Sequence, residues 1–129
     1  MRNMPTPFTH LEIAQRLLAD PLLPAELREE LAQERAAFLL GSVAADAHVN
    51  GLSREDTHFY TYTNPITRPP WRAMLDYFPA INPPRTPAHR AFLAGYVAHL
   101  SVDVVWTLDM LGPHFATSEW GESRAFRFL

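Results

Sequence analysis

One apolar segment, residues 86–111, constrains the fold of this chain more than any other. Thr86 and Pro87 form a typical helix start, and Gly112 and Pro113 form a typical helix end. The residues between them are apolar on nearly all sides, and a helix of that kind is normally buried. The sequence therefore predicts an all-α protein built around a long, central, buried helix.

Two ionisable residues lie in the middle of this apolar helix. His99 and Asp103 are four residues apart, so their side chains project on the same side, one turn from each other. A buried carboxylate is costly unless it is paired or bound to a metal ion. The carboxylate therefore needs a partner, and the spacing alone is equally consistent with two interpretations. The pair is either part of a metal site or forms a His–Asp hydrogen bond that stabilises the core.

The same segment is close to the length of about 20 residues that spans a bilayer. It contains His99, Asp103 and Asp109, and acidic residues within a span are costly. We therefore expect a protein core and no membrane span. The first 15 residues lack the apolar core of a secretory signal, which makes a cytoplasmic location the default expectation.

The composition narrows the possible chemistry. The 129 residues suit a single domain, 1–129, and the net charge of -3 gives no reason to expect nucleic-acid affinity. The chain contains neither Cys nor Lys, which excludes disulfides, thiolate nucleophiles and a Schiff-base lysine. Any metal ion must be held by nitrogen and oxygen ligands from His, Asp and Glu.

The rest of the chain reads as further helices in a compact multi-helix bundle. Breaks at proline and glycine separate helical patterns, which we expect over residues 9–20, 24–50, 71–78 and 118–129. Thr9 and Glu12 form a capping-box pattern for the first helix. Residues 51–70 form an irregular loop, in which Ser53 and Asp56 cap one short turn.

A second acidic residue lies at the end of the helix expected over 24–50. Asp46 follows a run of small and apolar residues, in which Gly41 and Ser42 would let another helix approach closely. The helix dipole disfavours an acid at a C-terminus, so a ligand or hydrogen-bonding role explains Asp46 better. His58 follows in the loop.

Three segments, FLLGSVAADAH, THFY and FLAGYVAHLSVDVVW, resemble in this order the zinc-dependent phospholipase C family. The resemblance implies an all-α fold with one to three zinc ions between its helices. It also implies a metal-dependent phosphoric ester hydrolase, in which a water molecule bound to the metal attacks a phosphodiester, with phospholipid head groups among the candidate substrates.

Matched residue by residue, the resemblance implies a ligand set. Asp46, His58, His99 and Asp103 would hold one zinc ion. His10 resembles an early ligand of a neighbouring zinc ion, which Asp103 would bridge. Asp46 would also orient the attacking water as a base, which makes it the candidate catalytic residue.

Two other readings remain. Family members carry further ligands that end in a His-x-x-x-Glu segment, and this spacing does not occur before Leu129. We therefore expect either a chain truncated at its C-terminus or a reduced site. A reduced site favours a non-catalytic metal-binding or purely structural helical interaction module. A phosphohydrolase of the HD type ranks last, because the chain contains no adjacent His-Asp pair.

Overall fold

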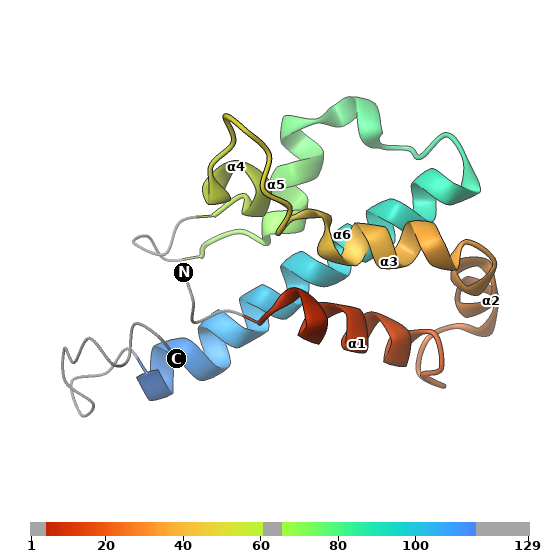
Figure 1. Ribbon diagram of the computed structural model, residues 1–129, viewed down its shortest axis with the longest axis horizontal. Helices are drawn as coiled ribbons and strands as arrows, with labels where there is room; N and C mark the ends of the chain where they lie inside the picture. Colours follow the sequence, from red (N-terminus) through yellow and green to blue (C-terminus); the bar gives the residue numbers. More distant parts are fainter. Residues whose placement is uncertain (1–4, 61–65, 116–129) are drawn as a thin grey trace.

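The computed structural model describes residues 5–60 and 66–115, and every regular element within these ranges is helical (Figure 1). The six α-helices are α1 (Pro7–Leu17), α2 (Ala25–Gln33), α3 (Arg35–Ala44), α4 (Arg54–His58), α5 (Pro70–Tyr77) and α6 (Pro87–Val105). A short 3-10 turn, η1 (Pro79–Ile81), precedes α6, and wider π-type turns, η2 (Trp106–Phe115), continue it. The prediction of an all-α fold is confirmed.

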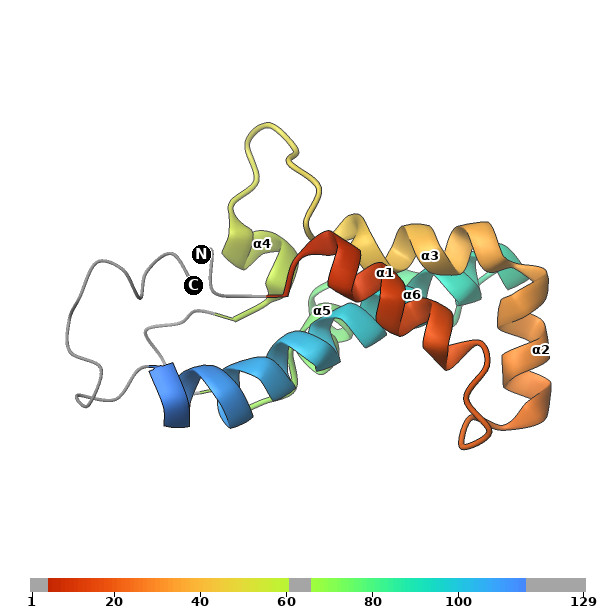
Figure 2. The same cartoon turned by 60° about the horizontal axis from the view of Figure 1, so that its bottom comes forward.

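Helix α6 is the central element of the bundle. It packs most extensively against α3 and also contacts α1, α2 and α5. Figures 1 and 2 show α1 and α3 crossing α6 at an angle, and these two helices also contact each other. The core between them is formed by the buried side chains of Ala14, Leu31, Phe38 and Ala91.

Two glycines set the distance between α3 and α6. A Cβ atom added to Gly41 would lie 2.1 Å from the backbone oxygen of Phe92. A Cβ atom added to Gly95 would lie 2.2 Å from the backbone oxygen of Phe38. The predicted close approach at the small residues of α3 is therefore confirmed, and α6 supplies a matching glycine. Only a residue without a Cβ fits at either position.

The first helix begins earlier than predicted. Helix α1 starts at Pro7, and the Thr6 hydroxyl accepts a hydrogen bond from the Thr9 backbone N–H at 3.4 Å. The Thr9–Glu12 capping box is therefore wrong. Pro7 fits the first helical position because its missing N–H would have no partner there, and Thr6 supplies the capping oxygen. Glu12 instead pairs with Arg16.

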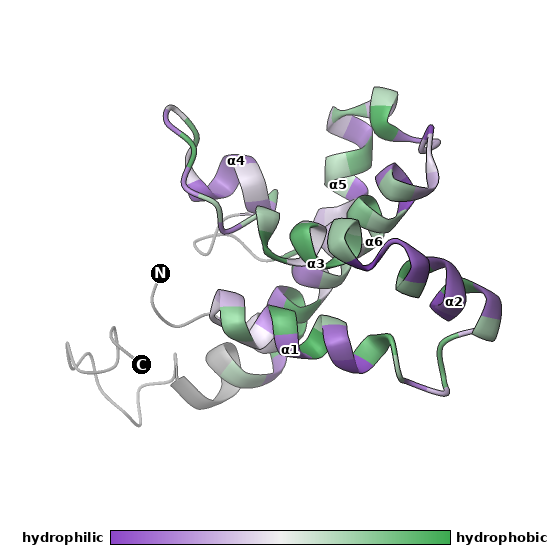
Figure 3. Ribbon diagram, turned by 45° about the vertical axis from the view of Figure 1, so that its right-hand side comes forward, coloured by the Kyte–Doolittle hydropathy of each residue, from purple (hydrophilic) through white to green (hydrophobic). Residues whose placement is uncertain are grey.

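The helix predicted over 24–50 is two helices. The backbone leaves helical geometry at Glu34 (φ -106°, ψ 37°), where the sequence changes from the charged α2 to the apolar α3. Figure 3 shows this change in hydropathy. Helix α3 then ends at Ala44, so Asp46 lies in the turn beyond the helix rather than in its last turn.

The short turn predicted within 51–70 is helix α4. The Ser53 hydroxyl accepts from the Asp56 backbone N–H at 3.2 Å, and the Asp56 carboxylate accepts from the Ser53 backbone N–H at 2.7 Å. This reciprocal capping box is confirmed. Phe59 follows in a left-handed conformation (φ 62°) that ends α4 directly after His58.

The central helix is buried along one stripe rather than on all sides. By length and composition alone, Pro87–Met110 is long and apolar enough to cross a membrane, and 28% of an apolar 18-residue stretch within it is buried inside the molecule. Val105 and Leu108 are more than half exposed among the described residues. That the helix belongs to a protein core and not to a membrane stays a prediction.

The predicted end of this helix at Leu111 is wrong. Helical turns continue to Phe115 with π-type spacing. Pro113 has no N–H to donate at any spacing, but a wider turn moves the carbonyl of the fourth preceding residue away from its ring, so the helical turns can continue past it. The helix predicted over 118–129 lies outside the described residues.

Candidate metal centre

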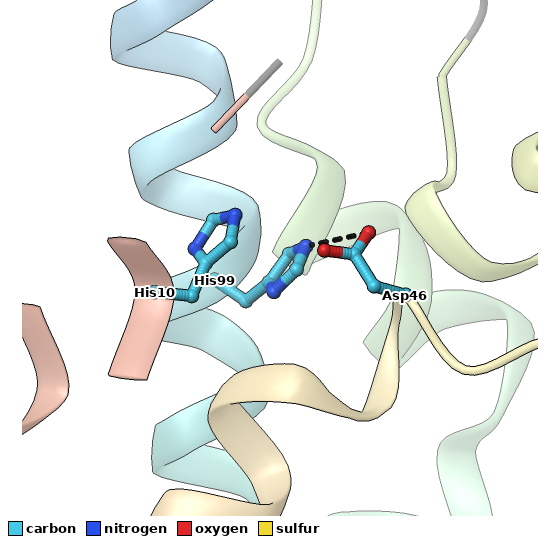
Figure 4. Close-up of side chains that lie close together, drawn as sticks. All are labelled: His10, Asp46 and His99. Atoms are coloured by element: carbon cyan, nitrogen blue, oxygen red, sulfur yellow. Dashed lines mark ion pairs between the residues drawn. The ribbon is translucent and has the colours of Figure 1, made fainter. Parts of the chain in front are cut away.

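The five residues singled out as ligands come together from four parts of the chain. They are His10 on α1, Asp46 after α3, His58 at the end of α4, and His99 and Asp103 on α6. Figure 4 shows His10, Asp46 and His99 pointing toward one another from their separate elements. All but Asp46 are at least 97% buried. Their assignment as metal ligands stays a prediction, but their convergence is a property of the fold.

The five side chains form two overlapping groups of three. His10, Asp46 and His99 each present one ligand atom within 4.8 Å of the other two. His58, His99 and Asp103 do the same, so the two groups share His99. Imidazole nitrogens and carboxylate oxygens are the ligands that zinc accepts in the absence of thiolates. The donor set therefore fits this metal ion.

The imidazole of His99 is oriented by the helix crossing. Its Nδ1 donates to the backbone oxygen of Ser42 on α3 at 2.7 Å. A neutral His99 that donates from Nδ1 carries a lone pair on Nε2. That atom faces the Asp103 carboxylate at 3.3 Å and the Asp46 carboxylate at 3.6 Å. The close contact of α3 and α6 thus turns a nitrogen lone pair toward the centre.

The imidazole of His58 is oriented in the same way by α4. Its Nδ1 lies 3.1 Å from the Arg54 backbone oxygen and 2.9 Å from the Thr57 hydroxyl. The Thr57 hydroxyl itself donates to the Arg54 oxygen, so it accepts from His58. The Nε2 atom of His58 then faces the Nε2 atom of His99 at 3.2 Å and Asp46 Oδ1 at 3.2 Å.

These orientations bring hydrogen-bond acceptors face to face. With both imidazoles neutral, the converging atoms of His58, His99, Asp46 and Asp103 all carry lone pairs. Acceptors that meet at such distances repel unless positive charge lies between them, from a proton or a metal ion. Metal-binding histidines commonly donate their second N–H to a backbone carbonyl, as both do here.

His10 and Asp103 form a buried pair at the centre. The His10 ring stacks on that of His99 with centroids 3.6 Å apart, and its Nε2 lies 3.1 Å from Asp103 Oδ1. Within the described chain, neither ring nitrogen of His10 and neither carboxylate oxygen of Asp103 makes a hydrogen bond of good geometry. Buried polar atoms in this state are rare and costly. Coordination of a metal ion would satisfy one nitrogen of His10 and the carboxylate of Asp103.

The electrostatic environment keeps both carboxylates charged. Burial alone raises the pKa of Asp103, but the neighbouring imidazoles of His10 and His99 outweigh it and lower that pKa to about 2. Burial likewise raises the pKa of Asp46, and His58, His99 and His10 bring it below its usual value. Burial lowers the pKa of His99, but Asp103, the Ser42 carbonyl and Asp46 give a net increase.

A cavity of about 650 Å³ opens beside Asp46 and His58. Residues 45–54 form most of its wall, and Pro5, Thr6 and Pro7 lie on another side. His10, His99 and Asp103 do not line it. The centre therefore has a rim that a small molecule can reach and a deep part that it cannot.

The sequence analysis missed two residues of this site. Arg54 lies within 3.6 Å of both Asp46 and Asp103, and its position four residues before His58 on a capped helix was a signal for it. The Tyr96 hydroxyl donates to the Thr57 backbone oxygen at 2.6 Å, which ties α6 to α4. Burial and the charge of Asp46 raise the pKa of Tyr96 to about 12, so this hydroxyl keeps its proton.

Comparison with known proteins identifies one relationship. The family described as zinc dependent phospholipase C matches residues 9–126, which include all five converging side chains. No curated protein and no solved structure matches the chain.

Proposed function

The chain belongs to the zinc-dependent phospholipase C family, and from this premise we propose that it is a zinc-dependent hydrolase of phosphodiester bonds. In this proposal the metal ligands are His10, Asp46, His58, His99 and Asp103. Phospholipid head groups are the substrate class that the family suggests.

One observation carries the proposal. The Nε2 atoms of His58 and His99 face each other at 3.2 Å while both Nδ1 atoms are directed at backbone carbonyls. A core hydrogen bond between two histidines needs only one donor and one acceptor. Here two carboxylates, Asp46 and Asp103, converge on the same point, and Arg54 balances only one of them, so a further positive charge from a metal ion or a proton must lie among them.

Bound zinc would supply Lewis acidity to a phosphate group and make water a nucleophile at neutral pH. The side chains of the protein would orient the attacking water. Asp46 lies at the cavity, and its contact with His58 helps to keep it ionised. An ionised carboxylate at this rim can accept a hydrogen bond from water and orient it toward a phosphorus atom. His99 and Asp103, which are almost completely buried, would hold the metal ion.

Zinc content and hydrolysis, measured on the same samples, test this proposal. Protein purified without chelator should contain at least one equivalent of zinc and hydrolyse a chromogenic phosphodiester. His99→Ala should lose most of both. His89→Ala on the same helix is the matched control, because the His89 side chain accepts from the Arg85 backbone N–H and lies outside the cluster, and this variant should keep both. Wild-type activity that is unchanged in zinc-free protein would contradict the proposal.

A second candidate function is a structural metal site without catalysis. It is favoured by the depth of His10, His99 and Asp103, which are at least 97% buried and do not line the cavity. An ion held there would stabilise the bundle without meeting a substrate. Bound zinc that raises the melting temperature, together with no hydrolysis of any phosphodiester tested, would favour this candidate over the hydrolase.

A further inference from the structure

Arg54 is a charged residue of the centre that the proposed reaction leaves without a role. It is the first residue of α4, directly after the Ser53 cap and one turn before His58. Its Nη1 lies 3.6 Å from Asp46 Oδ1, and its Nη2 lies 3.6 Å from Asp103 Oδ2. The side chain is 15% exposed, so a full positive charge is largely buried beside two carboxylates.

The charges at this point have a simple consequence for a metal-loaded site. A guanidinium keeps its proton in proteins, so Arg54 stays positive whatever else binds. Two carboxylates and one divalent ion are neutral together. The site would then carry one net positive charge, and that charge would belong to Arg54. A phosphodiester group carries one negative charge, which matches it.

The cavity exposes this charge to an entering molecule. Arg54 lines it together with Asp46, Thr57 and His58. The chain contains no Lys, and among the described residues that line the cavity Arg54 is the only Arg. The planar fork of a guanidinium also matches two phosphate oxygens at once, which an ammonium does not. Among the described residues that line the cavity, Arg54 is thus the one fixed cation, and it lies beside Asp46 and Asp103.

We propose that Arg54 binds the phosphate group of the substrate. Its contacts with Asp46 and Asp103 hold the guanidinium beside the metal site until an anion enters. This inference rests on the proposed zinc-dependent hydrolase. It adds that the anion is recognised by the chain's own cation and not by metal ions alone.

Phosphate binding to the zinc-loaded protein tests the inference without relying on activity. Inorganic phosphate is titrated by calorimetry into wild type, Arg54→Gln, Arg54→Lys and the control Arg16→Gln, in which an exposed Arg of α1 paired with Glu12 is changed in the same way. Loss of a charge-assisted contact should weaken phosphate binding roughly 10- to 100-fold in Arg54→Gln. Arg54→Lys should lie between the two, and Arg16→Gln should match wild type.

Zinc affinity is measured on the same variants. Arg54→Gln should bind zinc at least as tightly as wild type, because a cation that shares both carboxylates has been removed. Unchanged phosphate affinity in zinc-loaded Arg54→Gln would overturn the inference, and so would wild-type protein that holds zinc but no phosphate. Weaker zinc binding in Arg54→Gln would show that the residue supports the fold instead.

Failure of the proposed function and failure of the Arg54 inference give different results in these experiments. Wild-type protein that binds no zinc would overturn the proposed function itself, and this result needs no variant. If Arg54→Gln does not give the circular dichroism of a folded helical protein, the phosphate affinity of Arg54→Lys tests the inference instead. This variant keeps the charge but loses the fork, so its phosphate affinity should fall about 3- to 10-fold. An unchanged affinity would overturn the inference.

Discussion

The metal centre has two halves that are built in different ways. The deep half consists of His10, His99 and Asp103, which are carried by two long helices and are almost completely buried. The rim half consists of Asp46 and His58, one in a turn after α3 and the other at the end of a five-residue helix. The deep half is fixed by packing between helices, and the rim half is fixed by local hydrogen bonds.

This difference assigns different properties to the two halves. Packing around the deep half involves the core of the bundle, so its geometry cannot change without cost to the whole fold. The rim half depends on the Ser53 cap and on the Tyr96 hydroxyl bound to the Thr57 carbonyl. We therefore expect the deep half to govern stability and metal affinity, and the rim half to govern access and chemistry.

The largest effect should come from separating the helices that carry the deep half. In Gly95→Ala, the added Cβ would lie 2.2 Å from the Phe38 backbone oxygen, which no side-chain rotation can relieve. We expect a loss of about 3 kcal/mol in the free energy of unfolding, despite the better helix propensity of alanine. Urea denaturation measures it. Ala88→Ser, an exposed change on the same helix, should cost under about 0.5 kcal/mol.

Removing one carboxylate from each half compares them directly. Asp103 has its pKa lowered from 3.8 to about 2, so it stabilises the folded state above about pH 4 and loses this contribution as pH falls toward 2. In zinc-stripped protein at neutral pH, Asp103→Asn should therefore cost about 2 kcal/mol. Asp46→Asn should cost less, because Asp46 is more exposed. If urea denaturation shows the same loss in the free energy of unfolding for both variants, the two halves do not differ in their contribution to stability.

The pKa of His99 makes the two states of the protein respond oppositely to pH. Because this pKa is raised above 6.5, protonated His99 stabilises zinc-free protein in acid, and the contribution is lost as pH rises through the folded-state pKa. Zinc needs the neutral imidazole, so its affinity should fall about tenfold per pH unit below that pKa. Thermal unfolding with and without zinc, at pH 6 and pH 8, should show zinc adding more stability at pH 8. A larger zinc effect at pH 6 would contradict this.

The smallest effect should come from loosening the rim. Ser53→Ala removes the hydroxyl that caps α4, at a cost of about 1 kcal/mol confined to that helix. Hydrogen exchange should rise at α4 while the amides of α6 stay protected. Ser53→Thr keeps a capping hydroxyl and should restore protection. If Ser53→Ala also loosens α6, the rim is not independent of the deep half.

The sequence predicted the deep half better than the rim. His99 and Asp103 lie on one regular helix, where spacing alone places them together. The glycine in α3 signalled a close helix contact, which the structure confirms. Helix periodicity is a local property, so a single sequence is enough to detect it.

The positions of the rim residues cannot be predicted from helix periodicity. The break at Glu34 has no proline or glycine to mark it, so the sequence pattern predicts one helix across α2 and α3, with Asp46 near its end. Arg54 reaches the centre only because α4 folds back over the turn after α3, and this depends on contacts between elements. Sequence spacing carries no information about such contacts.

The spread of the five converging residues along the chain has one more consequence. One of the two groups of three runs from His10 to His99, so an ion bound to it would cross-link segments nearly ninety residues apart in a chain that has no cysteine to do so. Closing loops of that length restricts the unfolded chain, in the way that a disulfide does. The last two residues of the set are also the last to be synthesised, so the ring of ligands closes only when α6 docks against the helices made before it.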